Sequence, residues 1–287
     1  EQLDLISVCT TARMRCAIIN DVAQSRVRGI WAEKPIALSV DEADAIVDVC
    51  RRNSVAVAVN CARRWNPHFE TARGLIDDGE LGEVLQVTAY AQCGLSHNGS
   101  HAIDTIRYLA GGDVSWVFGE MESDEAAEGE NDLQGNGYLA FDNGVRAYLR
   151  ALPTGIASWE FDVVGTEGRI RSLAGATEWE LWKTAPGGPR GRGVPARLPY
   201  PMPARIPGMG ITIVEDLISA VEGGPAPRCS AEDGRAALEI AIALRESHRR
   251  GGERVNLPAE DRSLRILSSE IREDSEPARI RRLHASG

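Results

Sequence analysis

The sequence predicts an α/β domain with a partial Rossmann-like parallel sheet, followed by an α+β domain with a large, mostly antiparallel open sheet. Two observations support this fold class. Strand and helix patterns alternate over residues 5–59, whereas strand patterns follow one another almost without helices over residues 114–182. The composition agrees with it, because 43% hydrophobic and 26% charged residues are typical of globular proteins.

The first part of the chain predicts a β-α-β-α-β unit. Its elements are a strand at 5–9, a helix at 12–27, a strand at 29–32, a helix that begins after Ser39 and a strand at 55–59. Thr10 and Thr11 are able to cap the first helix, and Ser39 with Glu42 has the spacing of a capping box. The last strand is apolar at every position, which is typical of a strand buried on both faces of a parallel sheet.

Polar residues follow all three predicted parallel strands. They are Thr10, Thr11, Glu33, Lys34 and Asn60, and Pro35 follows directly after the lysine. Because ligands of such sheets bind at the carboxyl ends of the strands, we expect these residues to line a binding edge. The lysine stands out, since the 32 basic residues include only two lysines, Lys34 and Lys183. A lysine pKa can be tuned by its surroundings, whereas arginine stays protonated.

The second part of the chain predicts a sheet flanked by helices. The expected helices are 67–78, 100–109, 211–222 and 231–250, and the expected strands are 84–93, 114–119, 137–141, 145–151, 159–164, 168–172 and 179–182. Asp142-Asn143-Gly144 is typical of a hairpin turn between two of these strands. The acidic stretch 120–132 predicts a solvated loop. We therefore expect domains at 1–80 and 81–265 and a charged tail at 266–287.

Several classes of protein are excluded by charge and composition. The net charge of -10 argues against nucleic-acid binding. No apolar run approaches the roughly 20 residues that span a bilayer. The six cysteines are scattered without a CxxC motif, which favours reduced thiols in a cytoplasmic protein. His97 and His101 have the i, i+4 spacing of a zinc pair, but no third ligand is evident, and we expect no metal.

Three motifs, in this order and spacing, resemble the Gfo/Idh/MocA family of glucose–fructose oxidoreductase and inositol dehydrogenase. They are Glu33-Lys34-Pro35 after a parallel strand, Arg63-Arg64-Trp65-Asn66-Pro67 at the crossing to the second domain, and Gly99-Ser100-His101-Ala102-Ile103-Asp104 at a helix start. Shorter likenesses at 81–84 and 257–263 extend the resemblance over most of the chain. The resemblance implies an oxidoreductase that uses NAD or NADP and acts on a sugar, cyclitol or related polyol.

The resemblance also assigns expected roles to single residues. His101 would be the acid/base group, since a hydride leaving a secondary alcohol leaves a proton behind, and Lys34 would be its positioning and relay partner. The expected cofactor contacts are Thr10, Thr11, Glu33, Lys34, Pro35 and Asn60. The expected substrate contacts are Arg64, Trp65, His97, Asn98 and Asp104. His97 stands where the family often has aspartate, so it cannot supply a constant negative charge.

Four alternatives stay open at this point. One of Arg63 and Arg64 is expected to form a structural ion pair and the other to face the substrate. Asp104 fits either local pairing or substrate contact. The tryptophans after Val114 fit either a core or an oligomer face, and the family suggests a homodimer or homotetramer through the second-domain sheet. A non-catalytic sugar-binding or scaffold relative is the alternative to an enzyme.

The sequence contains no GxGxxG motif, and the glycine-rich stretch 187–193 follows no buried strand, so we expect a flexible loop there. In the family, the first strand, the glycine-rich turn and the acidic residue that binds the cofactor ribose would precede residue 1. The resemblance thus predicts an N-terminally incomplete chain that lacks the phosphate-binding part of the Rossmann domain.

Overall fold

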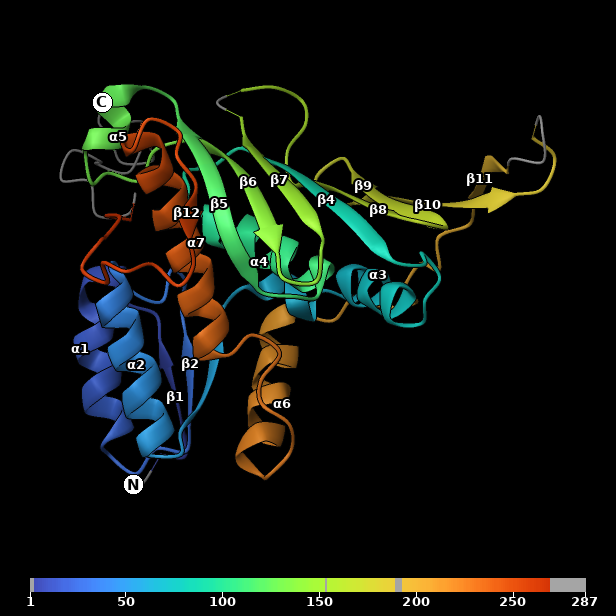
Figure 1. Ribbon diagram of the computed structural model, residues 1–287. Helices are drawn as coiled ribbons and strands as arrows, with labels where there is room; N and C mark the ends of the chain where they lie inside the picture. The colour runs from blue at the N-terminus through green and yellow to red at the C-terminus, as the bar shows by residue number, and fades with distance from the viewer. Residues whose placement is uncertain (1–2, 153, 189–192, 269–287) are drawn as a thin grey trace, which may run out of the picture.

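The structure is a computed structural model that describes residues 3–152, 154–188 and 193–268. Within these residues the strands form two sheets, a parallel one of three strands and a mixed one of nine (Figure 1). We call them the small sheet and the large sheet. Residues 269–287 of the predicted tail and residues 189–192 of the predicted glycine-rich loop lie outside the described residues.

The small sheet confirms the predicted β-α-β-α-β unit. Its strands β1 (Leu5–Val8), β2 (Gly29–Ala32) and β3 (Ala56–Val59) pair in that order and in parallel. Helices α1 (Ala12–Ala23) and α2 (Val40–Arg52) pack on each other at one side of this sheet, and α6 (Met209–Val221) packs on β2 and β3 at the other (Figure 1). All three carboxyl ends therefore point to the same edge, toward the large sheet.

The helix caps differ in part from the prediction. Thr11 is the N-cap residue of α1, but its side chain makes no capping hydrogen bond, so the expected threonine cap is wrong. Ser39 Oγ does accept from the Glu42 N–H of α2, at 3.4 Å. The Glu42 carboxylate accepts from Leu38 N rather than from the N-cap, and the capping box is thus only half formed.

The large sheet has the strand order β11-β10-β9-β8-β4-β7-β6-β5-β12. Its strands are β4 (Val84–Ala91), β5 (Val114–Met121), β6 (Gly135–Phe141), β7 (Arg146–Ala151), β8 (Glu160–Gly165), β9 (Gly168–Leu173), β10 (Glu178–Ala185), β11 (Val194–Leu198) and β12 (Val255–Asn256). Among the described strands of this sheet only β4 and β7 pair in parallel; the other neighbours are antiparallel. The predicted turn at 142–144 joins β6 to β7, and the predicted fold class is confirmed.

Four short elements were not predicted, and one of them is the 3-10 helix η1 (Ala62–Trp65). Helix α5 (Asp124–Glu128) lies inside the acidic stretch that we expected to be a loop, and Ser123 Oγ caps it by accepting from Ala126 N. Strands β11 and β12 have no clear alternating pattern, and β12 has only two residues. These elements are too short for periodicity to identify them, so their conformation depends on neighbours far along the chain.

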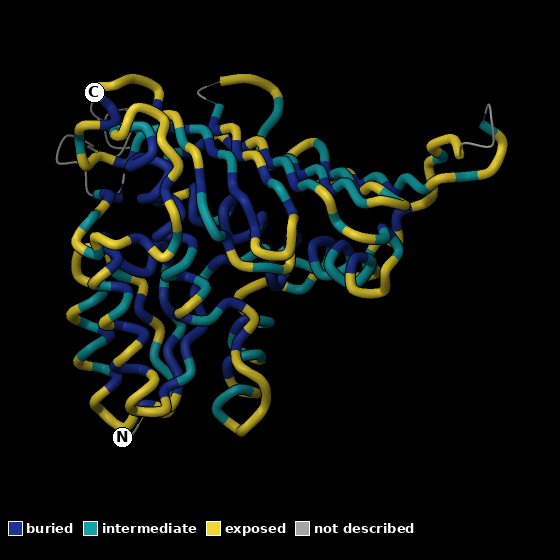
Figure 2. The backbone as a smooth tube through the Cα atoms, in the orientation of Figure 1, coloured by how far each residue is buried: buried dark blue, intermediate teal, exposed yellow. Residues whose placement is uncertain are grey.

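Helices cover only one face of the large sheet. Helix α4 (Gly99–Ala110) packs on β4 and β7, and α7 (Ala231–Arg249) packs on β5 and reaches β3 of the small sheet. Glycines allow these close contacts: a Cβ on Gly119 of β5 would meet Leu244 O of α7 at 2.0 Å, and one on Gly234 of α7 would meet Val59 of β3 at 2.9 Å. Helix α7 therefore belongs to both hydrophobic cores, which form one buried region (Figure 2).

The opposite face of the large sheet is open and aromatic. The rings of Trp116, Phe118, Tyr138 and Tyr148 contact one another across β5, β6 and β7, with Trp116 stacked on Tyr138 and the other pairs edge-on or tilted. Phe118 and Tyr148 keep 40% and 41% of their surface exposed. In the described part of the chain, no helix combines the length and apolar character that crossing a bilayer demands.

Candidate active site

The loop after β2 brings Lys34 to the edge of the small sheet. Lys34 is 8% exposed. The buried Arg15 guanidinium of α1 supports this loop by donating to the backbone oxygens of Pro35 and Thr10. Beside it, Asn60 Nδ2 donates to Glu33 Oε1 at 2.7 Å, which ties the ends of β3 and β2 together. The structure thus brings together the polar residues that follow the three parallel strands.

Lys34 contacts the segment that precedes α4. Its Nζ donates to His97 O at 3.0 Å and to Asn98 Oδ1 at 3.3 Å, and lies 3.5 Å from His97 Nε2. His101 follows three residues later on the first turn of α4. We call Lys34, His97, Asn98 and His101 the Lys34 cluster. It joins residues that lie more than sixty positions apart in the sequence.

Two residues that the sequence analysis missed hold this segment in place. Asp132 is 4% exposed, and its carboxylate accepts from the backbone N–H groups of Ser96 and His97, both at 2.7 Å. Ser268 Oγ lies 3.2 Å from His97 Nδ1. Asp132 falls in the acidic stretch that was expected to be solvated, and nothing local in the sequence marks it as buried.

The surroundings of His101 keep its imidazole neutral. Burial lowers the pKa of His101 well below its usual value of 6.5, and the positive charges of Arg63 and Lys34 lower it further. Its Nδ1 is buried without a hydrogen-bond partner among the described residues. An imidazole that is unprotonated at neutral pH is able to accept a proton from a neighbouring hydroxyl.

Arg63 and Trp159 lie beside His101. The Arg63 guanidinium carbon stacks 4.1 Å from the centroid of the Trp159 ring, and the His101 ring meets the same indole edge-on at 6.3 Å. The Trp159 backbone is in the left-handed region, with φ of 57°, which is uncommon for a bulky residue. Arg63 was named from the sequence as one of two open choices, and Trp159 was among the tryptophans expected in a core or an oligomer face; it contacts Arg63 and His101 instead.

Arg64 forms the structural ion pair that the sequence analysis left open. Its guanidinium donates through Nε and Nη2 to Asp104 at 2.7–3.1 Å and through Nη2 to Asp233 at 3.0 Å. Arg107 Nη1 also donates to Asp233, at 2.9 Å. Burial alone would lower the pKa of Arg64, but the carboxylates of Asp104 and Asp233 outweigh that effect and raise it. We call Arg64, Asp104, Arg107 and Asp233 the Arg64 network.

Three predicted substrate contacts are therefore engaged elsewhere. Asp104 is fully buried against Arg64, and Arg64 is 9% exposed. Trp65 is fully buried, and its Nε1 donates to Asp216 at 2.9 Å. The structure does not place Arg64, Trp65 and Asp104 with the Lys34 cluster, because their polar atoms bind to other parts of the chain. His97 and Asn98 are the predicted substrate contacts that it does place there.

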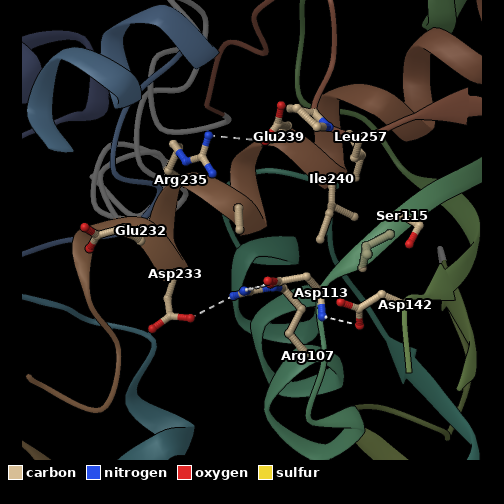
Figure 3. A pocket seen from close by; sticks show the side chains of 13 residues that line it. Arg107, Asp113, Ser115, Asp142, Glu232, Asp233, Arg235, Glu239, Ile240 and Leu257 are labelled. Carbon is tan, nitrogen blue, oxygen red and sulfur yellow. Dashed lines mark hydrogen bonds and ion pairs between the residues drawn. The ribbon is translucent and has the colours of Figure 1, made fainter. Parts of the chain in front are cut away.

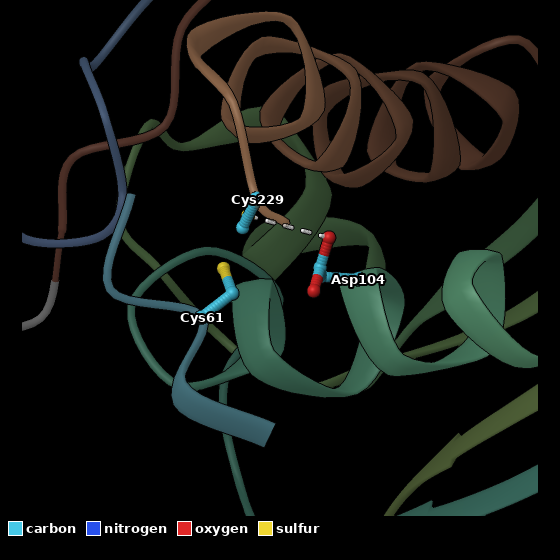
Figure 4. Close-up of side chains that lie close together, drawn as sticks. All are labelled: Cys61, Asp104 and Cys229. Carbon is cyan, nitrogen blue, oxygen red and sulfur yellow. Dashed lines mark hydrogen bonds between the residues drawn. The ribbon is translucent and has the colours of Figure 1, made fainter. Parts of the chain in front are cut away.

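Cys61, Asp104 and Cys229 meet in the core, with their ligand atoms within 4.8 Å of one another (Figure 4). Three such groups resemble a metal site, but both Asp104 oxygens already accept from the Arg64 guanidinium. Burial raises the pKa of the Cys229 thiol well above its usual value, and this thiol lies 3.8 Å from Asp104 Oδ1. A protonated thiol beside an arginine fits a structural cluster better than a cation site.

A cavity of about 620 Å³ lies on the outer side of the Arg64 network, between α4, α7 and β5 (Figure 3). Its charged walls are largely paired with one another: Arg107 contacts Asp233 and Asp113, and Arg235 contacts Glu239. None of the residues predicted for the active site lines this cavity. It does not belong to the Lys34 cluster.

Two family models match the chain. "Oxidoreductase family, NAD-binding Rossmann fold" matches residues 1–61, and "Oxidoreductase family, C-terminal alpha/beta domain" matches residues 73–257. A scyllo-inositol 2-dehydrogenase (NAD(+)) of Bacillus subtilis is 26% identical over 58% of this chain and 54% of its own length. A myo-inositol 2-dehydrogenase of Thermotoga maritima is 23% identical over 85% of this chain and 77% of its own length.

A solved structure shows the same fold. The oxidoreductase domain protein from Kribbella flavida superimposes with a TM-score of 0.74 at 19% identity, over 89% of this chain and 80% of that one. The chain spans about half the length of the Bacillus relative. Together the two family models cover most of the chain, and the chain belongs to the Gfo/Idh/MocA family of oxidoreductases.

Proposed function

We propose that the chain acts as an oxidoreductase that uses NAD or NADP and transfers a hydride at a CH–OH group of a sugar, cyclitol or related polyol. The observation that carries the proposal is the Lys34 cluster. A buried lysine after a parallel strand contacts the segment that leads to a neutral histidine, in a chain of this family. The inositol dehydrogenases of Bacillus subtilis and Thermotoga maritima described above support the class of substrate.

The residues at the edge of the small sheet fit the nicotinamide end of such a cofactor. Thr10 Oγ1 is buried without a hydrogen-bond partner among the described residues. The Glu33–Asn60 hydrogen bond holds the turn after β2 against the end of β3. Thr10, Thr11, Glu33, Lys34, Pro35 and Asn60 would hold the group. When bound, the nicotinamide supplies the hydride acceptor or donor. The sequence has no glycine-rich GxGxxG turn for the pyrophosphate.

His101 would take the proton of the substrate hydroxyl while the C–H bond breaks and its hydride leaves, and would return the proton in the reverse direction. Lys34, held by His97 O and Asn98 Oδ1, would donate a hydrogen bond to the same substrate oxygen and position it. His97 and Asn98 would bind further hydroxyls. We assign Arg64, Trp65 and Asp104 a structural role instead.

We also propose that the chain divides into domains 1–80 and 81–265.

We further propose that the protein is a homodimer or homotetramer that associates through the open face of the large sheet. The aromatic residues on that face are half-exposed, and open aromatic patches are typical of association sites. Sedimentation equilibrium tests this: a chain that stays monomeric at micromolar concentration would contradict the oligomer. The cytoplasmic location stays a prediction.

The decisive test compares Lys34→Ala and His101→Ala with the purified chain. Loss of an acid/base group or its positioning partner is expected to lower turnover of a polyol by about 100-fold or more. Circular dichroism should show an unchanged fold, since neither side chain is part of the hydrophobic core. Lys183→Ala is the matched control, because Lys183 forms an ion pair with Glu80 on the large sheet.

Cofactor binding, followed by calorimetry or by tryptophan quenching, separates this proposal from the alternative. Turnover that survives Lys34→Ala or His101→Ala would remove the site assignment. Failure of the chain to bind either NAD or NADP at millimolar concentration would contradict the proposed activity for this chain, which would then be an incomplete or repurposed module, such as a non-catalytic sugar-binding or scaffold relative.

A further inference from the structure

We propose that the substrate carries a carboxylate, that Arg63 binds this carboxylate, and that the polyol acted on at His101 is therefore a sugar acid. The inference rests on the proposed oxidoreductase function and adds the chemical class of its substrate. Three features of the structure lead to it: the uncompensated charge of Arg63, the stacking of its guanidinium, and its position beside His101.

Arg63 holds a positive charge that the described residues do not neutralise. It belongs to the 3-10 helix η1 (Ala62–Trp65) and is half-buried. In the described ranges no carboxylate forms an ion pair with it, and its guanidinium donates no hydrogen bond, whereas the adjacent Arg64 contacts two carboxylates. Burial lowers the pKa of Arg63 to about 10, which leaves it charged at neutral pH. A partly desolvated cation without a counter-ion is unfavourable, and a bound anion would offset that cost.

The stacking of Arg63 leaves its hydrogen-bond donors available. The guanidinium lies against the face of the Trp159 ring, at 4.1 Å from its centroid. Because the N–H groups of a guanidinium lie in its plane, this contact uses the face and leaves the edge for a bidentate carboxylate. Trp159 takes an uncommon left-handed backbone conformation, with φ of 57°. Such conformations cluster at ligand-binding sites, where the fold holds a side chain in one orientation.

The position of Arg63 puts the anion beside the reacting carbon. Trp159 contacts both Arg63 and His101, and Arg63 is the charged residue that acts most strongly on the His101 imidazole. The neighbouring carboxylates have other partners: Glu33 accepts from Asn60, and Asp132 accepts from Ser96 N and His97 N. One available guanidinium matches the charge and the two oxygens of one carboxylate better than a phosphate dianion.

Calorimetric titration of the chain with matched pairs of ligands tests the proposal without any turnover. Suitable pairs are D-gluconate with D-glucitol and D-galacturonate with D-galactose, and D-glucose 6-phosphate serves as the phosphate probe. At least one acid should bind about tenfold tighter than its neutral partner, as expected for charge-assisted hydrogen bonds. Arg63→Gln should abolish this preference without changing the affinity for the neutral partner, and Arg63→Lys should keep part of it.

Arg254→Gln is the matched control, because the Arg254 guanidinium also lies over a tryptophan, 5.4 Å from the Trp116 ring on the open face. It should leave all affinities unchanged. Acids that bind no tighter than their neutral partners would overturn the proposal, as would equal losses for both in Arg63→Gln, or tighter binding of the phosphate. The proposed oxidoreductase function fails separately, if no ligand of either kind is oxidised or reduced with NAD or NADP.

Discussion

The Arg64 network and the Lys34 cluster meet on one helix yet differ in how their polar groups are satisfied. Asp104 of α4 belongs to the network, and His101, one turn earlier, belongs to the cluster. In the network, both carboxylates accept several charged hydrogen bonds from arginines, and each arginine has a carboxylate partner, although Arg107 Nε is buried without a described acceptor. In the cluster, His101 Nδ1 is buried without a described partner, and Arg63 beside His101 has no carboxylate counter-ion among the described residues.

This difference separates a structural role from a binding role. Groups that satisfy one another inside the fold have little left to offer a ligand, whereas unsatisfied groups become favourable only when something binds. Arg63 and Arg64 are adjacent and show the contrast directly, because Arg64 pairs with two carboxylates and Arg63 pairs with none among the described residues. Two kinds of experiment test this comparison: substitutions that disrupt the Arg64 network, and pH changes that titrate His101 of the Lys34 cluster.

The largest effect is expected from the network. Asp104→Asn leaves Arg64 without its bidentate carboxylate in a fully buried position. Breaking a buried ion pair on one side typically costs about 3–5 kcal/mol of unfolding free energy. Urea denaturation of the variant and the parent chain measures the loss.

Glu232→Gln is the control, because Glu232 and Arg51 form an exposed ion pair, with side chains 51% and 67% accessible. Its cost should stay below about 1 kcal/mol. Equal losses for Asp104→Asn and Glu232→Gln would show that the network does not hold the fold together, and the structural assignment of Arg64 and Asp104 would then be wrong.

A smaller effect is expected from the cluster, through pH. The pKa of folded His101 lies below its usual 6.5, so under pH 6.5 the unfolded chain binds a proton there that the folded chain does not. The free energy of unfolding should therefore fall with falling pH, by up to about 1.4 kcal/mol per pH unit from this group. Urea denaturation at about pH 7.5 and at about pH 5.5 measures how the free energy of unfolding changes with pH.

His101→Gln should make that slope shallower. His68, whose pKa is also lowered by burial, stays in both chains and cancels in the comparison. The same reasoning places the acidic limb of any pH–rate profile below pH 6.5. Identical slopes in the two chains would mean that His101 is not held neutral by its surroundings.

Most of the fold could be predicted from the sequence because its signals are local. Strand β2 has the bounds that were expected, and α4, expected at 100–109, ends just after that range at Gly111, its C-cap residue with φ of 73°. The hairpin at 142–144 follows from its turn residues. Such features depend on a few neighbouring residues, which periodicity and turn chemistry describe well.

The site could be predicted only in part, because its partners are far apart along the chain. The motifs indicated Lys34 and His101, but which of two adjacent arginines is buried depends on Asp104 and Asp233, 40 and 169 positions beyond Arg64. Asp132 looked like a solvated acid until the backbone of residues 96–97 was placed against it. Trp159 was expected in a core or an oligomer face, and its contact with Arg63 and His101 depends on a left-handed backbone conformation that the sequence does not signal.

Helix α7 has a consequence for how the protein comes apart. Its first turns lie against β3 and its later turns against β5, at contacts so close that both need glycine. Melting either sheet would strip this helix of half its packing and expose it to water. We therefore expect the described part of the chain to denature as one cooperative unit, with a single calorimetric transition rather than one for each predicted domain.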